Sequence, residues 1–269
     1  MGVNMKIRIK FTKTGPIKFI GHLDIMRYFQ KAFRRAGVDV EYSQGFSPHQ
    51  LLSFAAPLGV GLTSDGEYMD AQLYSCDSPE VMLERLNAVM AEGIRVIGFQ
   101  ILPENSRNAM SIVAAADYLV SLKDGYEYMD KTAFRNAFTE FYNRDSIVIS
   151  KKTKKSETDT DIRPLIYHIA FQEEDFYDGF GEDTGISNRR PTVAESYEND
   201  IKLYMRLAAG SVNNLKPELV MEAFCRYAGI TFNAFAYQVH RMEVYADKGE
   251  DTVRRLAALD QMDTVKVYV

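Results

Sequence analysis

The predicted order of strands and helices in the first hundred residues constrains the fold of this chain most strongly. Residues 6–12 alternate basic and apolar side chains, which is the pattern of a strand with one buried face. Residues 23–36 carry an apolar stripe with helical spacing, and Gly37 is placed to end that helix. The next expected elements are two strands, a helix that starts after Asp77 and a last strand: residues 51–56, 67–74, 78–92 and 94–102.

This β-α-β-β-α-β order is the ferredoxin-like plan, and the same order recurs later in the chain. The later elements are expected as strands and two helices: strands 117–123, 146–151, 162–171, 201–208 and 235–245, and helices 131–142 and 217–227. We therefore predict an α+β protein with two ferredoxin-like (βαββαβ-type) halves, each built on its own antiparallel sheet.

The break after residue 102 sets the expected domain boundary. The N-terminal domain is predicted to comprise residues 1–105 and the C-terminal domain residues 111–269. An acidic, glycine-rich stretch near 173–198 is expected to be a mobile insertion in the second domain. A short helix over 252–259 and an edge strand over 265–269 are expected to end the chain.

Charge and cysteine content exclude several classes of protein. The net charge is −5, so nucleic acid could bind only at a local basic surface. Cys76 and Cys225 are far apart, which indicates a reducing compartment and argues against a zinc site or a thiolate-held cluster. No apolar run is long enough to span a bilayer, so we expect a cytoplasmic protein that does not bind membranes.

Known nucleotide-binding, hydrolase and metalloprotease motifs are absent from the sequence, so no cofactor or metal is expected. His22, Asp24 and His49 are weak candidates for acid–base catalysis, because such side chains can transfer protons near neutral pH. His22 and Asp24 are two residues apart and do not face each other on a helix, so a structural histidine is the simpler interpretation. A metal site would need His49 or Asp70 to be brought in by the fold.

The first expected helix carries a basic face opposite its apolar stripe. Arg27, Lys31, Arg34 and Arg35 have the spacing i, i+4, i+7 and i+8, and Asp24 is the nearby acid. An ordinary solvated helix face is one interpretation, and contact with RNA phosphates is the other.

A second basic cluster lies at the tip of an expected hairpin. It consists of Lys151, Lys152, Lys154 and Lys155, and acidic residues follow it at once. The sequence supports two interpretations of this cluster equally: an ordinary solvated surface, and a surface that contacts phosphates. If RNA binds both clusters, the fold must bring them to one surface.

Two further arginines stand among apolar neighbours. Arg163 lies at the start of an expected strand, and Arg241 follows His240 within another. The favoured interpretation is that each arginine pairs with an acid. The alternative is that its guanidinium is free to bind an anionic ligand.

Two runs near the N-terminus resemble the radical SAM-linked protein family. They comprise Gly21, His22, Asp24 and Arg27 in the first run and Ser43, Gly45, Phe46, Pro48 and His49 in the second, with Arg163 and Arg241 as later landmarks. The resemblance covers most of the chain and is specific over residues 1–75. Members are fused to, or encoded beside, B12-binding radical-SAM proteins, which implies a radical-SAM protein as partner. Because this chain has no cluster cysteines, the resemblance implies that the radical chemistry belongs to the partner.

Together, these observations favour a non-catalytic RNA-binding or substrate-presenting partner of a radical-SAM enzyme that acts on tRNA or rRNA. One alternative is an RNA-processing or RNA-modifying enzyme that uses His22 or His49. Another is a protein–protein adaptor that binds no nucleic acid. We further expect Phe46 to pack against the first helix and to order the turn around it.

Overall fold

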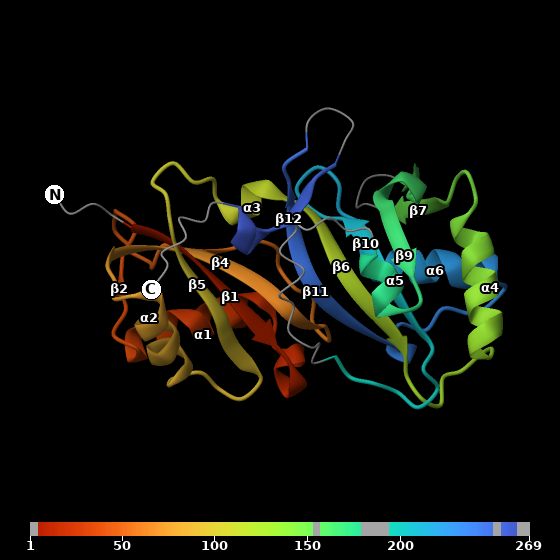
Figure 1. Ribbon diagram of the computed structural model, residues 1–269, viewed down its shortest axis with the longest axis horizontal. Helices are drawn as coiled ribbons and strands as arrows, with labels where there is room; N and C mark the ends of the chain where they lie inside the picture. The colour runs from red at the N-terminus through yellow and green to blue at the C-terminus, as the bar shows by residue number, and fades with distance from the viewer. Residues whose placement is uncertain (1–4, 153–156, 179–193, 250–253, 263–269) are drawn as a thin grey trace.

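A computed structural model describes residues 5–152, 157–178, 194–249 and 254–262 (Figure 1). In the N-terminal half the strands form an antiparallel layer in the order β5-β1-β4, with β2 and β3 on the far side of β4. These elements are β1 (Met5–Lys13), β2 (Asp39–Val40), β3 (Leu52–Phe54), β4 (Thr63–Ser75), β5 (Ile94–Leu102), α1 (His22–Arg35) and α2 (Pro79–Asn87).

The C-terminal half continues with a second antiparallel layer in the order β11-β6-β10-β9. Its strands are β6 (Val113–Leu122), β7 (Val148–Lys152), β8 (Glu157–Asp161), β9 (Ile166–Ala170), β10 (Lys202–Ala208), β11 (Tyr237–Asp247) and β12 (Leu256–Ala258). Its helices are α3 (Ala109–Ile112), α4 (Lys131–Tyr142), α5 (Glu173–Tyr177) and α6 (Pro217–Tyr227). The strands β7 and β8 form a separate hairpin.

A short parallel pairing between β4 and β11 joins the two layers into one ten-stranded sheet over the described residues. His240 lies beside Thr63 and Arg241 beside Ser64 in this pairing, which we call the seam. The prediction of a separate sheet in each half is therefore wrong. Each layer would expose an edge strand at this point, and pairing the two edges satisfies their backbone groups.

Apolar side chains of the helices cover one face of the sheet. Ile25, Phe29 and Phe33 of α1 pack with β1, β4 and β5, as the predicted apolar stripe requires. Phe134, Phe138 and Phe141 of α4 belong to a second cluster that also includes α6, β6 and β10. The chain is thus α+β with a mostly antiparallel sheet, and its helices lie mainly on one face (Figure 1).

Local sequence signals account for most helix ends. Gly37 follows α1 with a φ of +63°, and the amide of Val38 donates to the carbonyl of Phe33, as in a helix that ends at a left-handed glycine. Ser78 caps α2, and α6 begins at Pro217 as predicted.

The C-terminal helix predicted over residues 252–259 is not formed where the chain is described. Leu256–Ala258 instead pair with β11 as β12, and all three side chains are buried. Burial against a long neighbouring strand outweighs the weak local preference for a helix. The strand predicted over 265–269 lies outside the described residues.

The acidic stretch 173–198 is anchored at both of its described ends. Phe176 of α5 is buried and stacks near His168 and Tyr204, and Glu195 forms an ion pair with Lys18 at 2.6 Å. Residues 179–193 lie outside the described part of the chain, and they contain most of the predicted insertion.

Candidate functional site

Buried charges meet across the seam on the face that carries the helices. Nε of Arg241 on β11 donates to Oε1 of Glu67 on β4 at 2.8 Å, and its Nη2 donates to Glu67 Oε2 and to the carbonyl of Ala56. Burial alone would lower the pKa of Arg241, but the Glu67 carboxylate raises it above its ordinary value. The predicted pairing of Arg241 with an acid is confirmed, so this guanidinium is not waiting for an anion.

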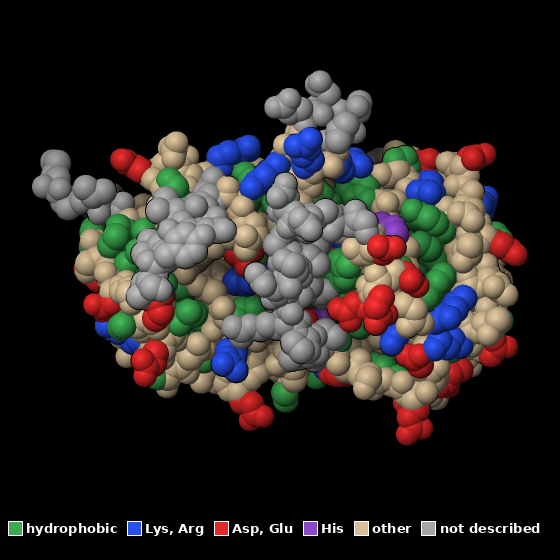
Figure 2. Space-filling view, viewed as in Figure 1, with side chains coloured by type: hydrophobic (Ala, Val, Ile, Leu, Met, Phe, Trp, Pro, Cys, Tyr) green, Lys and Arg blue, Asp and Glu red, His purple; other side chains and the backbone are tan. Residues whose placement is uncertain are grey.

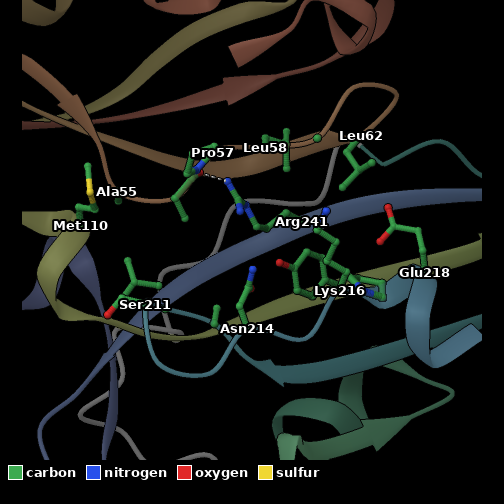
Figure 3. A pocket seen from close by; sticks show the side chains of 17 residues that line it. Ala55, Pro57, Leu58, Leu62, Met110, Ser211, Asn214, Lys216, Glu218 and Arg241 are labelled. Carbon is green, nitrogen blue, oxygen red and sulfur yellow. Dashed lines mark hydrogen bonds between the residues drawn. The ribbon is translucent and has the colours of Figure 1, made fainter. Parts of the chain in front are cut away.

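A cavity of about 540 Å³ opens beside this ion pair, between the two halves (Figure 3). Apolar side chains form most of its wall, with Pro57, Leu58 and Leu62 from the segment before β4 and Met110 from α3. Polar groups enter from the start of α6 and from the loop before it. We call this hollow the seam cavity.

Glu218 is the unusual member of the seam cavity. It projects from the first turn of α6 on the same side as Leu62 (Figure 3). Its Oε2 atom is buried and has no hydrogen-bond partner among the described residues. A buried carboxylate oxygen without a donor is costly, although Glu218 as a whole is only half-buried.

Tyr118 of β6 supplies a donor at the same cavity. Burial raises the pKa of Tyr118, and the guanidinium of Arg241, which lies near the Tyr118 hydroxyl, only partly opposes that rise. The phenol therefore keeps its proton. Lys216 and Asn214, both exposed, add a cation and an amide at the start of α6.

The predicted basic residues of α1 form an exposed face on the N-terminal half of the molecule. Arg27 forms an ion pair with Asp24 at 3.1 Å, and both side chains are well exposed. Arg35 donates to the carbonyl of Val89, so it is tied to the end of α2. Lys31 and Arg34 are exposed and form no ion pair within the described part of the chain. We call Arg27, Lys31 and Arg34 the α1 basic face.

The N-terminus of α1 lies next to the seam cavity. Gly21 caps the helix, and the ring of His22 packs edge-on against Phe54 with ring centres 5.1 Å apart. A small hollow beneath His22 shares the wall segment 56–58 with the seam cavity. The first motif run therefore positions a helix start beside the cavity, with His22 in a packing role.

The second motif run forms a loop that is closed at its base by polar contacts. The hydroxyl of Ser43 lies 2.8 Å from Nδ1 of His49, and the Ser43 amide donates to the His49 carbonyl. Gly45 has a φ of +112°, which only glycine adopts easily. Phe46 at the tip is fully exposed, and Pro48 is exposed as well. The prediction that Phe46 packs against α1 is wrong, because the contacts at the loop base hold the turn without it.

The candidate acid–base residues do not form a single site. His49 lines a hollow that also contains Asp70 and Lys6, whereas His22 lines the hollow beside the seam cavity. The Asp70 carboxylate is held by Arg8 at 2.7 Å. Within the described ranges, no group of three or more His, Cys, Asp or Glu side chains could hold a metal ion.

The remaining predicted site residues lie elsewhere. Arg163 stacks over the ring of Tyr142 at 4.0 Å and donates to the carbonyl of Ile166, so it has a packing role. Lys151 and Lys152 belong to β7, while Lys154 and Lys155 lie outside the described residues. Helix α1 and β7 belong to different halves and lie well apart along the long axis in Figure 1. The structure thus does not bring the α1 basic face close to β7.

The opposite face of the seam is also held by buried charges. Lys10 of β1 donates to Glu243 of β11 at 2.5 Å, and Glu243 accepts from Tyr68 at 2.7 Å. Burial raises the pKa of Glu243, whereas Lys10 opposes that rise. Further along, Asp117 accepts two hydrogen bonds from Arg206 and one from Tyr245. Figure 2, which looks onto one face of the molecule, shows acidic and basic side chains mixed over its surface.

Sequence reasoning missed Glu218, which lines the seam cavity, and Glu67, which forms the ion pair beside it. Glu218 follows Pro217 in a predicted first helical turn, where an acid is common and raises no suspicion. Glu67 was assigned to a predicted strand without a partner. A signal for Glu67 existed in Arg241, since a buried arginine in a strand requires an acid on a neighbouring strand.

Comparison with known proteins identifies a family for most of the chain. A model of the family described as "Uncharacterized protein conserved in bacteria (DUF2344)" matches residues 6–217. Among solved structures, the chain is similar to one described as "Crystal Structure of an Unknown Protein from Galdieria sulphuraria". That similarity has 10% identity and a TM-score of 0.23, and it covers 89% of this chain and 98% of the other. No curated protein matches the chain.

Proposed function

We propose that this chain, which belongs to the conserved bacterial family DUF2344, is a non-catalytic RNA-binding or substrate-presenting partner of a radical-SAM enzyme that acts on tRNA or rRNA. The observation that carries the proposal is the α1 basic face. Arg27, Lys31 and Arg34 are exposed together on one helix of an acidic protein, and Asp24 pairs with Arg27. Such a local surface can bind phosphates although the whole chain is negative.

The surroundings of this helix support contact with RNA rather than with a small anion. Phe46 stands exposed on a loop of the same half, and an unpaired base can stack on such a ring. The cations lie on successive turns of α1, so they are spaced along a line, as a nucleic-acid backbone requires.

We also propose that each half is a ferredoxin-like unit. In the N-terminal half, β5 and β4 flank β1, with β2 and β3 outside β4. In the C-terminal half, β11 and β10 flank β6, with β9 outside β10. Both orders match the β-α-β-β-α-β plan when the β7–β8 hairpin is set aside.

The radical-SAM partner is proposed from the resemblance of the two motif runs. Cys76 and Cys225 lie in different halves, and burial raises the pKa of both thiols, so neither is prepared to bind a metal as a thiolate. The iron–sulfur cluster and the radical step would belong to the partner. The role left for this chain is to hold or present the RNA.

A capture experiment in cells of the source organism tests both parts of the proposal. The tagged chain is crosslinked by ultraviolet light, and the bound RNA and proteins are identified. We expect tRNA or rRNA fragments, with crosslinked peptides from residues 22–35 and 43–49, together with a radical-SAM protein. The variant R27E/K31E/R34E should lose the RNA, while the control R95E/R144E/R226E, which changes the charge equally at exposed sites, should retain it. Equal RNA recovery with both variants would contradict the proposal.

A protein adaptor that binds no nucleic acid is the second candidate, and exposed apolar side chains favour it. Phe19, Leu23 and Val60 are each more than half exposed, and Phe46 is fully exposed. Recovery of a protein partner without RNA would support the adaptor. In that case F46A or L23S should weaken the recovery of the partner, whereas R27E/K31E/R34E should not.

The enzyme alternative makes a different prediction for the histidines. If the chain cleaves or modifies RNA by itself, H22A or H49A should abolish turnover of purified RNA and leave affinity unchanged. The two rings lie in separate hollows, so we expect no turnover by the purified wild-type chain.

A further inference from the structure

The second motif run lies on a small hairpin that leaves the edge of the sheet between β2 and β3. Both ends of this segment, residues 41–51, are fixed to Gln72 of β4. The Glu41 amide donates to the Gln72 carbonyl, and the Gln72 amide donates to the Leu51 carbonyl. The Leu51 amide in turn donates to the Glu41 carbonyl, which closes the hairpin at its base. We call residues 41–51 the arm.

The tip of the arm is held by a second set of contacts. The Ser43 amide donates to the His49 carbonyl, and the His49 amide donates to the Ser43 hydroxyl at 3.0 Å. That hydroxyl also lies 2.8 Å from Nδ1 of His49. Phe46 stands above these contacts with its ring fully exposed. An apolar ring held in water gains nothing from burial in the free chain, so the tip is suited to a partner that covers the ring.

The composition of the arm indicates the kind of partner that it fits. Residues 42–50 contain no Asp, Glu, Lys or Arg, and serine, glutamine, glycine and proline surround the ring of Phe46. A stable protein interface buries about 800 Å² on each partner, which is far more than one ring offers. A nucleobase, in contrast, stacks on a single ring, and hydroxyl and amide groups beside that ring can bond to the base edge or to a ribose hydroxyl. These features favour an RNA base over a protein pocket.

We propose that the arm binds an unpaired nucleotide of an RNA loop, with the base stacked on the ring of Phe46. This inference rests on the proposed RNA function and deepens it by naming the class of RNA. In a continuous duplex both faces of each internal base are already stacked, so the ring finds no free face there. Ser43 and His49 act as positioning residues, because they fix the turn before RNA arrives and so lower the entropic cost of binding.

A matched pair of RNAs tests this inference with the full chain. One is a hairpin closed by an all-adenosine loop, and the other is a blunt duplex of the same stem; both are titrated by fluorescence anisotropy. We expect the hairpin to bind more tightly. F46A should weaken binding of the hairpin by about 5- to 150-fold, the usual range for one stacked base, and leave binding of the duplex unchanged.

Variants at the same position separate stacking from simple apolar contact. F46W and F46Y keep a flat ring and should bind the hairpin as the wild type does. F46L is apolar but has no ring, so it should behave like F46A. Because Phe46 is fully exposed, none of these changes removes a core contact. S43A should weaken hairpin binding less than F46A does, and S43T, which restores the hydroxyl, should recover it.

The salt dependence distinguishes the arm from the α1 basic face. Stacking releases no counter-ions, so F46A should leave the salt slope of hairpin binding unchanged, whereas R27E/K31E/R34E should flatten it. Equal binding of hairpin and duplex by the wild type, or hairpin binding by F46L as tight as that of the wild type, would overturn the inference and leave the RNA proposal standing. If neither RNA binds at low salt, the proposed function itself fails. Recovery of a radical-SAM protein that then depends on Phe46 would assign the arm to a protein pocket.

Discussion

The ion pair between Arg241 and Glu67 makes a quantitative prediction about how the two halves are joined. Both side chains are about 5% exposed, and the arginine also donates to the Ala56 carbonyl. Breaking a buried pair by removing one partner costs about 3–5 kcal/mol, because the other charge is left without compensation. We expect R241Q and E67Q to destabilise the chain within this range.

The two single variants should differ in a direction that the structure fixes. Lys13 is buried close to the pair. Burial lowers the pKa of its ammonium, and the nearby Glu67 carboxylate only partly offsets that effect. In R241Q, Lys13 remains as a counter-ion for Glu67. In E67Q, Arg241 and Lys13 are two buried cations without an acid between them. E67Q should therefore cost more, near the upper end of the range of about 3–5 kcal/mol.

The assay is urea unfolding followed by far-ultraviolet circular dichroism, since the chain contains no tryptophan. The double variant E67M/R241M should recover most of the lost stability, because an apolar pair of similar volume replaces the charges. Costs below about 1 kcal/mol for both single variants would refute the reasoning, since that is the range of exposed pairs. Additive costs in the double variant would refute it as well, because contacting residues should couple.

Two further predictions concern a glycine and a histidine. In thermal melts, G210A should lower stability by about 1–3 kcal/mol. Gly210 has a φ of +140°, and an added Cβ would lie 2.4 Å from the Val113 carbonyl oxygen. The control G59A, which makes no such close contact, should be neutral. Stability should fall as the pH drops below about 6.5, because burial and Arg206 lower the pKa of His168 in the folded state, so the unfolded chain takes up the proton first. H168Q should flatten that part of the pH–stability curve, and an unchanged curve would exclude His168 as its origin.

Regular periodicity made the helices of this chain predictable from sequence. Helices α4 and α6 begin and end at the predicted residues, because their apolar spacing is regular and α6 starts with proline. The seam was not predictable in the same way. It joins Thr63–Ser64 to His240–Arg241, and such distant pairing leaves no periodic mark on either strand. Residues 256–258 were wrongly expected to be helical for a similar reason. Their strand conformation depends on pairing with β11, which is not visible in the local sequence.

The candidate site divides along similar lines. The basic spacing on α1 was visible because it belongs to one helix. The seam cavity was not, because its wall combines the segment before β4, α3 and the start of α6, which the fold alone brings together. Phe46 was misjudged because an aromatic residue between polar ones was expected to be buried, whereas Ser43 and His49 close the loop below it.

The salt dependence of RNA binding tests the central claim most directly. The affinity of the wild-type chain for a structured RNA is measured at several salt concentrations and compared with that of R27E/K31E/R34E. Each phosphate contact contributes about 0.9 to the slope of log affinity against log salt on duplex and about 0.7 on single strands. If the α1 basic face binds phosphates, the variant should bind more weakly and its slope should be flatter by about 2 to 3. Equal slopes, or no binding by the wild-type chain at low salt, would contradict the claim that this face contacts RNA.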